Sequence, residues 1–166
     1  MEKAGMDLAG VVDEAERLLA DGSSRSRSLV AAAVGKMGDL PGMSDGQRIE
    51  WAKLVGLFAR DRETVVRAVL AETVKRNPGI PPEVAERMAR DVIEVARPIL
   101  MHSEALSDDV LIDLVEGGDT GKQDAIIGRR RISVALSRAI IDECEQGQVA
   151  RLAANNGAEL SEKDLE

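Results

Sequence analysis

The amino-acid sequence predicts an all-α protein whose helices stack into a right-handed superhelix, or solenoid, of about ten helices. Apolar residues return at intervals of three and four along most of the chain, whereas the alternation typical of strands is weak. Helix caps and breaks containing Gly or Pro separate the apolar runs. One short sequence unit also returns at fixed spacings, as in stacked helix pairs that bury their apolar faces against their neighbours.

The first half of the chain contains four expected helices. Turn residues end the first two, at Gly22 and at 38–42. Ser44 and Gln47 form a capping-box pattern at the start of the third helix, because each side chain can bond the other residue's free backbone donor. Asp61 is the expected cap of the fourth helix. The expected ranges are 7–20, 25–37, 44–61 and 61–74. The apolar side chains expected inside include Leu29, Ile49, Leu57 and Val65.

The second half continues in the same way. Pro82 stands in the first turn of a fifth helix, where proline loses no hydrogen bond, and Asp91 with Glu94 is the expected cap of a sixth. Pro98 lies inside that sixth helix and predicts a kink. Ser107 is the expected cap of a seventh helix. The remaining helices are expected over 123–129, 133–144 and 148–154, with a last one starting at Ser161.

The repeated unit is most evident at a spacing of thirty residues. Ala59-Arg60-Asp61 followed by Val65-Val66-Arg67 returns as Ala89-Arg90-Asp91 followed by Val95-Ala96-Arg97, without a gap. A further shift of fifty-four residues brings the last of these segments onto Val149-Ala150-Arg151. We therefore expect the three arginines that end these segments to hold one position of a structural repeat.

The composition excludes several classes of protein. A net charge of -8 and a pI near 4.8 argue against a surface that attracts nucleic-acid backbones or anionic lipids. Trp51 and Phe58 are the only aromatic residues, too few for the stacking side chains of single-stranded nucleic-acid binders. No apolar run approaches the roughly 20 residues that span a bilayer. Cys144 is the single cysteine, so no disulfide can form within the chain and we expect a cytoplasmic protein. From the charge, the few aromatic residues and the short apolar runs, we expect no nucleic-acid or membrane partner.

The repeat also carries a family resemblance. Its Asp, Val-Arg and alternating aliphatic residues resemble the second helix of HEAT repeats. From Trp51 to the end, the order of segments resembles the alphaproteobacterial family of domain of unknown function 2336. The segments concerned are 59–61, 89–100, Ser103, 106–109, 125–131 and 153–158. The resemblance implies a cytoplasmic bacterial repeat protein of unassigned activity. We expect one helical-repeat domain over residues 1–166, alone or as the N-terminal part of a longer array.

Arg67, Arg97 and Arg151 are the first candidates for a binding site. Guanidinium groups pair bidentately with carboxylates and phosphates, so a ladder of arginines along one face could grip an acidic peptide. In the alternative interpretation, each arginine bonds an aspartate such as Asp61 or Asp91, or a loop carbonyl, in a neighbouring repeat and stiffens the stack. This second interpretation is favoured because it needs no ligand.

Arg129, Arg130 and Arg131 form a run of three basic residues in an acidic chain. They are the candidates for binding an anion or a phosphorylated ligand. Three consecutive residues at a helix end cannot all face one way, however. Cations there also complement the helix dipole. A solvated or dipole-pairing role is therefore the favoured interpretation.

His102 is the sole histidine and gives the one enzymatic hypothesis. With Asp108 or Asp109 it could act as an acid/base pair. Those carboxylates have the pattern of helix-capping residues, however, and one imidazole makes a poor transition-metal site. The acidic neighbours of Cys144 would raise the pKa of its thiol, which opposes nucleophilic use. We therefore expect no catalytic residue, no metal and no cofactor.

These observations favour a non-enzymatic scaffold or adaptor. Its partner is expected to be a protein or peptide, bound across the groove that alternate helices of the array line, since solenoids present extended faces of this kind. An open end of a repeat array exposes apolar surface, which also favours a homo-oligomer. The enzyme built on His102 and the anion site at Arg129 to Arg131 stay as alternatives.

Overall fold

The computed structural model describes residues 8–164, and every regular element in this part of the chain is a helix. The α-helices are α1 (Leu8–Asp21), α2 (Ser24–Met37), α3 (Asp45–Phe58), α4 (Thr64–Val74), α5 (Pro82–Ala89), α6 (Ile93–His102), α7 (Asp108–Glu116), α8 (Thr120–Ile127), α9 (Val134–Glu143) and α10 (Gln146–Ala153). A short 3-10 helix, η1 (Glu162–Asp164), follows. The prediction of an all-α fold with about ten helices is confirmed.

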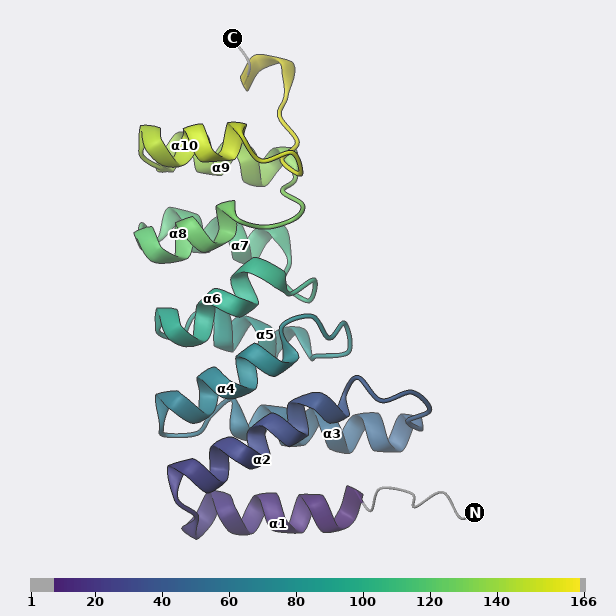
Figure 1. The fold of residues 1–166 in the computed structure, drawn as a ribbon. Coiled ribbons are helices and arrows are strands. Elements are labelled where there is room, and N and C mark those ends of the chain that lie inside the picture. Colours follow the sequence, from purple (N-terminus) through teal and green to yellow (C-terminus); the bar gives the residue numbers. More distant parts are fainter. Residues whose placement is uncertain (1–7, 165–166) are drawn as a thin grey trace.

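The helices form five consecutive pairs that follow one another along one axis (Figure 1). In the even-numbered row, α2, α4, α6, α8 and α10 each contact the next member of the row. The odd-numbered row holds α1, α3, α5, α7 and α9, and from α3 onward it lies behind the even-numbered row in Figure 1. Each odd-numbered helix also contacts the even-numbered helix that follows it. The even-numbered row is therefore continuous from one pair to the next.

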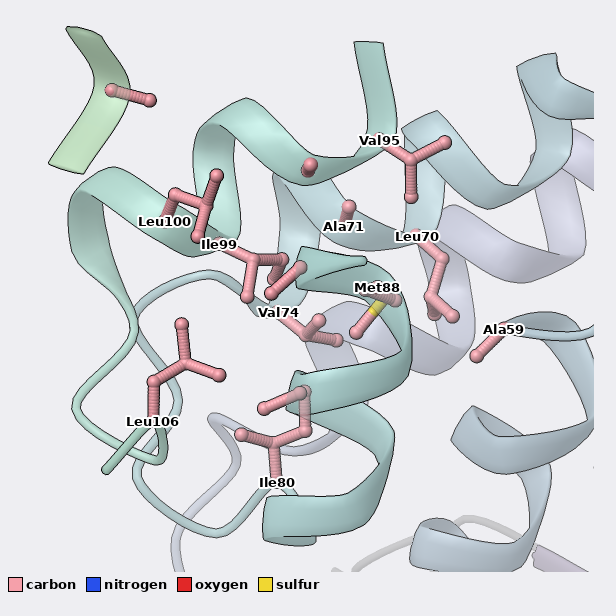
Figure 2. Close-up of a cluster of buried hydrophobic side chains, with 14 of the residues drawn as sticks. Ala59, Leu70, Ala71, Val74, Ile80, Met88, Val95, Ile99, Leu100 and Leu106 are labelled. Carbon is pink, nitrogen blue, oxygen red and sulfur yellow. The ribbon is translucent and has the colours of Figure 1, made fainter. Parts of the chain in front are cut away.

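The buried apolar side chains form one continuous core between the rows. It extends from Ala15 in α1 to Leu152 in α10. Figure 2 shows its central part, where Leu70 of α4, Met88 of α5 and Ile99 of α6 lie together. Successive pairs thus share one core, as expected when each pair buries its apolar face against its neighbours.

The serine caps predicted from the sequence are confirmed. Ser44 accepts a hydrogen bond from the backbone N of Gln47, and the Gln47 side chain accepts one from the backbone N of Ser44. Ser107 caps α7 by accepting from the backbone N of Val110. The start of α8 was predicted three residues too late, because Asp119 caps this helix ahead of the apolar run that marked it.

Asp61 and Asp91 are not the helix caps that the sequence predicted. The cap positions of α4 and α6 are held by Glu63 and Val92, and neither makes a side-chain capping bond. The Asp61 carboxylate accepts from the backbone N of Glu63, and that of Asp91 accepts from the backbone N of Val92. Both aspartates therefore order the loops before these helices, and each also holds an arginine, described below.

Four apolar side chains that were expected in the core are exposed instead. The exposed fractions of Leu29, Ile49, Leu57 and Val65 are 68, 57, 39 and 53 %. The reason is geometric: a helix in either row turns one side to the core, and its apolar stripe is wider than the side that becomes buried. Leu29 and Val65 both belong to the even-numbered row.

The structural repeat is one residue out of step with the sequence repeat. Helices α4 and α6 begin 29 residues apart, at Thr64 and Ile93, rather than thirty. The shorter spacing matches Val66 with Val95, and both are fully buried. A spacing of thirty would match Val95 with the exposed Val65. Which valine is buried therefore depends on its distance from the start of its helix, and not on the spacing that aligns the most similar residues.

Beyond the helices, one isolated parallel bridge joins Ile132 to Ala158. The backbone N of Ile132 donates to the carbonyl of Gly157 at 3.0 Å, and the backbone N of Glu159 donates to the carbonyl of Ile132 at 2.8 Å. This bridge fastens the segment after α10 to the loop before α9. Among residues 8–164, no helix combines the length and the apolar character needed to cross a membrane.

Candidate binding surface

Arginine and aspartate side chains connect the loops that lead into the even-numbered helices. Arg27 of α2 is buried and donates two hydrogen bonds to Asp61, from Nε at 2.7 Å and from Nη2 at 3.2 Å. Its Nη1 donates to the carbonyl of Gly22. Because Asp61 lies in the loop before α4, this buried ion pair joins the first two helix pairs.

Arg67 of α4 repeats this arrangement one pair further along. Its Nε and Nη2 donate to Asp91 at 2.6 and 3.0 Å, and its Nη1 donates to the carbonyl of Asp61 at 2.7 Å. The hydrogen bond to Asp91 raises the pKa of Arg67. Burial raises the pKa of Asp91, but the bonds from Arg67 and from the backbone of Val92 bring it below its ordinary value. Arg67 thus makes the contacts that the stack-stiffening interpretation requires.

The three arginines matched in the sequence do not hold one structural position. Arg67, Arg97 and Arg151 are the fourth, fifth and sixth residues of α4, α6 and α10. Arg151 donates to Asp124 of α8, which also accepts from Gln148 at 2.7 Å. Arg97 is exposed and has no side-chain hydrogen bond to any residue that the structure describes. Its charge nevertheless helps to lower the pKa of Asp124.

Arg129 lies at the opposite ends of the even-numbered helices. Its guanidinium donates to the carbonyls of Leu100 and Ser103, where α6 ends. Burial lowers the pKa of Arg129. Arg129 therefore satisfies carbonyls that the end of a helix leaves free, whereas Arg130 and Arg131 are exposed. The run of three arginines divides between these two environments.

His102 ends α6 and is half-buried among cations. Burial lowers the pKa of His102, and the charges of Arg76 and Lys75 lower it further. Asp108, one of its two proposed catalytic partners, accepts a hydrogen bond from Ser133 at 2.5 Å instead. The charge of Glu72 acts in the opposite direction on the pKa of His102, but it does not outweigh burial and the cations. This environment does not favour an acid/base pair.

The environment of Cys144 opposes nucleophilic use of its thiol. Burial raises the pKa of the Cys144 thiol, and the charges of Asp124 and Glu143 raise it further. Such a thiol is a poor nucleophile at neutral pH. Within residues 8–164, no three or more His, Cys, Asp or Glu side chains are grouped so that they could hold a metal ion.

A charged cleft of about 780 Å³ lies beside Arg67, between the end of α3 and α5. Its lining residues are Ala59, Arg60, Asp61, Arg67, Glu83, Glu86, Arg87, Arg90 and Asp91. The four arginines face four carboxylates, so the cleft as a whole has no excess charge with which to attract an anion. It does not by itself define a binding site.

The two rows differ strongly in charge, which sequence reasoning did not detect. The five odd-numbered helices carry five basic and fourteen acidic residues, a balance of -9. The five even-numbered helices carry seven basic and three acidic residues, a balance of +4. Alternate helices of an acidic protein therefore carry charge of opposite sign, although Asp61 and Asp91 in the loops neutralise Arg27 and Arg67 of the even-numbered row.

Arg27 was also missed, because forty residues separate it from Arg67 and the repeat was sought at thirty. The sequence contains a signal for it. Arg27 is followed by Ala31 four residues later and by Val34 seven residues later. An alanine and a valine stand at the same distances after Arg67. The members of this pattern that follow Arg27 are fully buried. The structural repeat is therefore identified by the buried alanine and valine at helical spacing after each arginine, and not by the residues that adjoin the arginine in the sequence.

Comparison with known proteins supports the family resemblance over the second part of the chain. Residues 95–166 match the family DUF2336, whose description is "Uncharacterised protein conserved in bacteria". No curated protein and no solved structure matches the chain. The matched segment runs from α6 to the end and includes the loop with Arg129, Arg130 and Arg131.

Proposed function

We propose that this chain, whose residues 95–166 match the DUF2336 family of bacterial proteins, is a right-handed HEAT-like solenoid that acts as a scaffold for an acidic protein or peptide. The even-numbered row is the binding surface. The observation that carries this proposal is the excess of basic residues on that row in a chain of net charge -8.

The net charge of the whole chain does not oppose this function. At physiological ionic strength, salt screens charges beyond a Debye length of about 8 Å. A helix with its side chains is about 10 Å across, so an acidic segment on the even-numbered row is largely screened from the odd-numbered row behind it. The balance within the even-numbered helices is +4, and subtracting the two charges of Asp61 and Asp91, the partners of Arg27 and Arg67, leaves +2, a local charge that favours an acidic ligand.

The arginines divide by role under this proposal. Arg27 and Arg67 are held by aspartates and join successive pairs, so they are not free for a ligand. Arg97 is exposed in α6 without such a partner among the described residues. Arg130 and Arg131, exposed after α8, extend the basic surface at one end. These three keep the binding role that the sequence suggested.

A display library of peptides about 20 residues long, selected on the immobilised full chain, tests the proposal. We expect enrichment of acidic peptides whose binding weakens as salt rises from about 50 to 150 mM. The double variant Arg25→Glu with Arg97→Glu should lose this binding. Arg48→Glu with Arg87→Glu changes the net charge equally on the odd-numbered row and should retain it. No acidic enrichment, or equal loss in both doubles, would refute the proposal.

A further inference from the structure

Two stripes that combine apolar and basic residues lie on α2 and on α4 with the residues that follow it. In α2, Arg25, Leu29 and Lys36 are exposed. They stand at positions i, i+4 and i+11, which place them on one side of a helix with 3.6 residues per turn. Leu29 lies two residues from both Arg27 and Ala31, which are buried. This side of α2 is therefore turned away from the core.

The stripe on α4 has the same spacing forty residues later. Val65, Val69 and Arg76 stand at the positions that correspond to those three residues. Val65 and Arg76 are exposed and Val69 is half-buried. The α2 stripe begins with a cation and the α4 stripe with a valine, but both have an apolar residue in the middle and a cation at or just after the C-terminal end of the helix.

The two stripes lie side by side because α2 and α4 pack closely. At Gly35 of α2 an added Cβ would stand 1.9 Å from Oγ1 of Thr73 in α4, so the helices approach too closely there for any side chain. Leu29, Val65 and Val69 are the apolar members of the two stripes, and we call this apolar centre the α2–α4 patch. Such exposed apolar groups with a polar rim are typical of interaction sites.

The charge around the α2–α4 patch is positive. Two of the three basic residues of α2, Arg25 and Lys36, are exposed, Arg27 is buried against Asp61, and α2 contains no acidic residue. Arg25 lies at one end of the patch, and Lys36 and Arg76 lie at the other. Glu72, the one carboxylate within α4, is exposed seven residues after Val65 on the same side of the helix, where Lys75 pairs with it. A partner segment that covers the apolar centre therefore has its flanking side chains next to these cations.

We infer that the α2–α4 patch binds an acidic amphipathic helix of a partner protein. The apolar stripe of that helix would cover Leu29, Val65 and Val69, and its carboxylates would pair with Arg25, Lys36 and Arg76. Two helices packed side by side present a groove into which a third can lay its apolar face. This inference rests on the proposed function and assigns it a location and a class of ligand.

The probe is a fluorescein-labelled peptide of about 18 residues with leucine at every third and fourth position and glutamate elsewhere. Fluorescence anisotropy measures its binding to the full chain and to single variants. We expect Leu29→Ser and Lys36→Glu each to weaken binding by about tenfold or more. Ile49→Ser and Arg48→Glu, at exposed positions of α3, are the controls and should bind as the parent does. Far-UV circular dichroism verifies that all variants fold.

Two peptide controls define the ligand. Replacing every glutamate by lysine, or every leucine by serine, should abolish binding. If the acidic peptide binds Leu29→Ser and Lys36→Glu with parental affinity, the location is wrong, while the proposed function stands. If acidic peptides from the library bind the chain but the helical probe does not, the helical ligand is wrong. Tighter binding of the lysine peptide would overturn both this inference and the proposed function.

Discussion

At the scale of single residues, Arg27 and Asp61 place an ion pair inside the core, with side chains only 2 and 3 % exposed. Asp61→Asn would leave the Arg27 charge buried without its counter-charge, so we expect the free energy of unfolding to fall by about 3–5 kcal/mol. Urea denaturation measures this loss. The control Lys53→Ala breaks an exposed pair with Glu50 and should cost at most about 1 kcal/mol. Equal losses in both variants would contradict the prediction.

His102 makes stability depend on pH near neutrality. Its pKa lies below the ordinary value of about 6.5, because burial and the nearby Arg76 and Lys75 disfavour the charged form. The unfolded chain therefore binds the proton more readily, and stability falls as pH drops through 6.5 toward the lower folded pKa. We expect the parent to lose more stability than His102→Gln between pH 7.5 and 5.5 in urea denaturation. An imidazole NMR resonance titrating at or above pH 6.5 would contradict this.

At the scale of helices, the sequence predicts the features whose cause lies within a few residues, and not those that depend on how separate helices pack. Ser44 with Gln47, and Ser107, cap helices through bonds within four residues, and the sequence showed them. The exposure of Leu29 and Val65 depends on how much of each helix its neighbours cover, which the spacing of apolar residues alone does not predict. The separation of charge between the rows likewise depends on which helices share a row. It becomes visible only when alternate helices are grouped.

Gly157 tests the bridge that fastens the segment after α10. An added Cβ would stand 1.8 Å from the backbone carbonyl of Arg130, so Gly157→Ala must displace one of the two backbones. We expect a loss of about 1–3 kcal/mol, as for other overpacked sites, in chemical denaturation. Gly147, inside α10, has no atom within 4 Å of an added Cβ. Gly147→Ala should therefore stabilise the chain by about 0.5–1 kcal/mol. A loss of stability in Gly147→Ala, or no loss in Gly157→Ala, would refute this account.

At the scale of the whole molecule, the strongest contacts between the helices of residues 8–164 join neighbouring pairs. Helix α2 packs on α1, α3 and α4, whereas α10 packs on α8 and α9. In an array of this kind, stability is approximately a sum of terms within and between adjacent units. Damage at one end should therefore weaken that end first. The chain offers an internal reporter, because its sole tryptophan, Trp51, lies in α3 and donates to the carbonyl of Val34 in α2 at 2.7 Å.

Leu152→Ala removes a buried side chain of α10, which commonly costs about 2–5 kcal/mol in a packed core. We expect far-UV circular dichroism to show an earlier unfolding phase in urea, while the midpoint from Trp51 fluorescence stays close to that of the parent. The matched change at the other end, Leu54→Ala in α3, should shift the fluorescence midpoint as well. If Leu152→Ala moves both signals together, the chain unfolds as one cooperative unit. The array would then transmit damage along its whole length, because the shared core from Ala15 to Leu152 would couple the pairs more strongly than their separate contacts suggest.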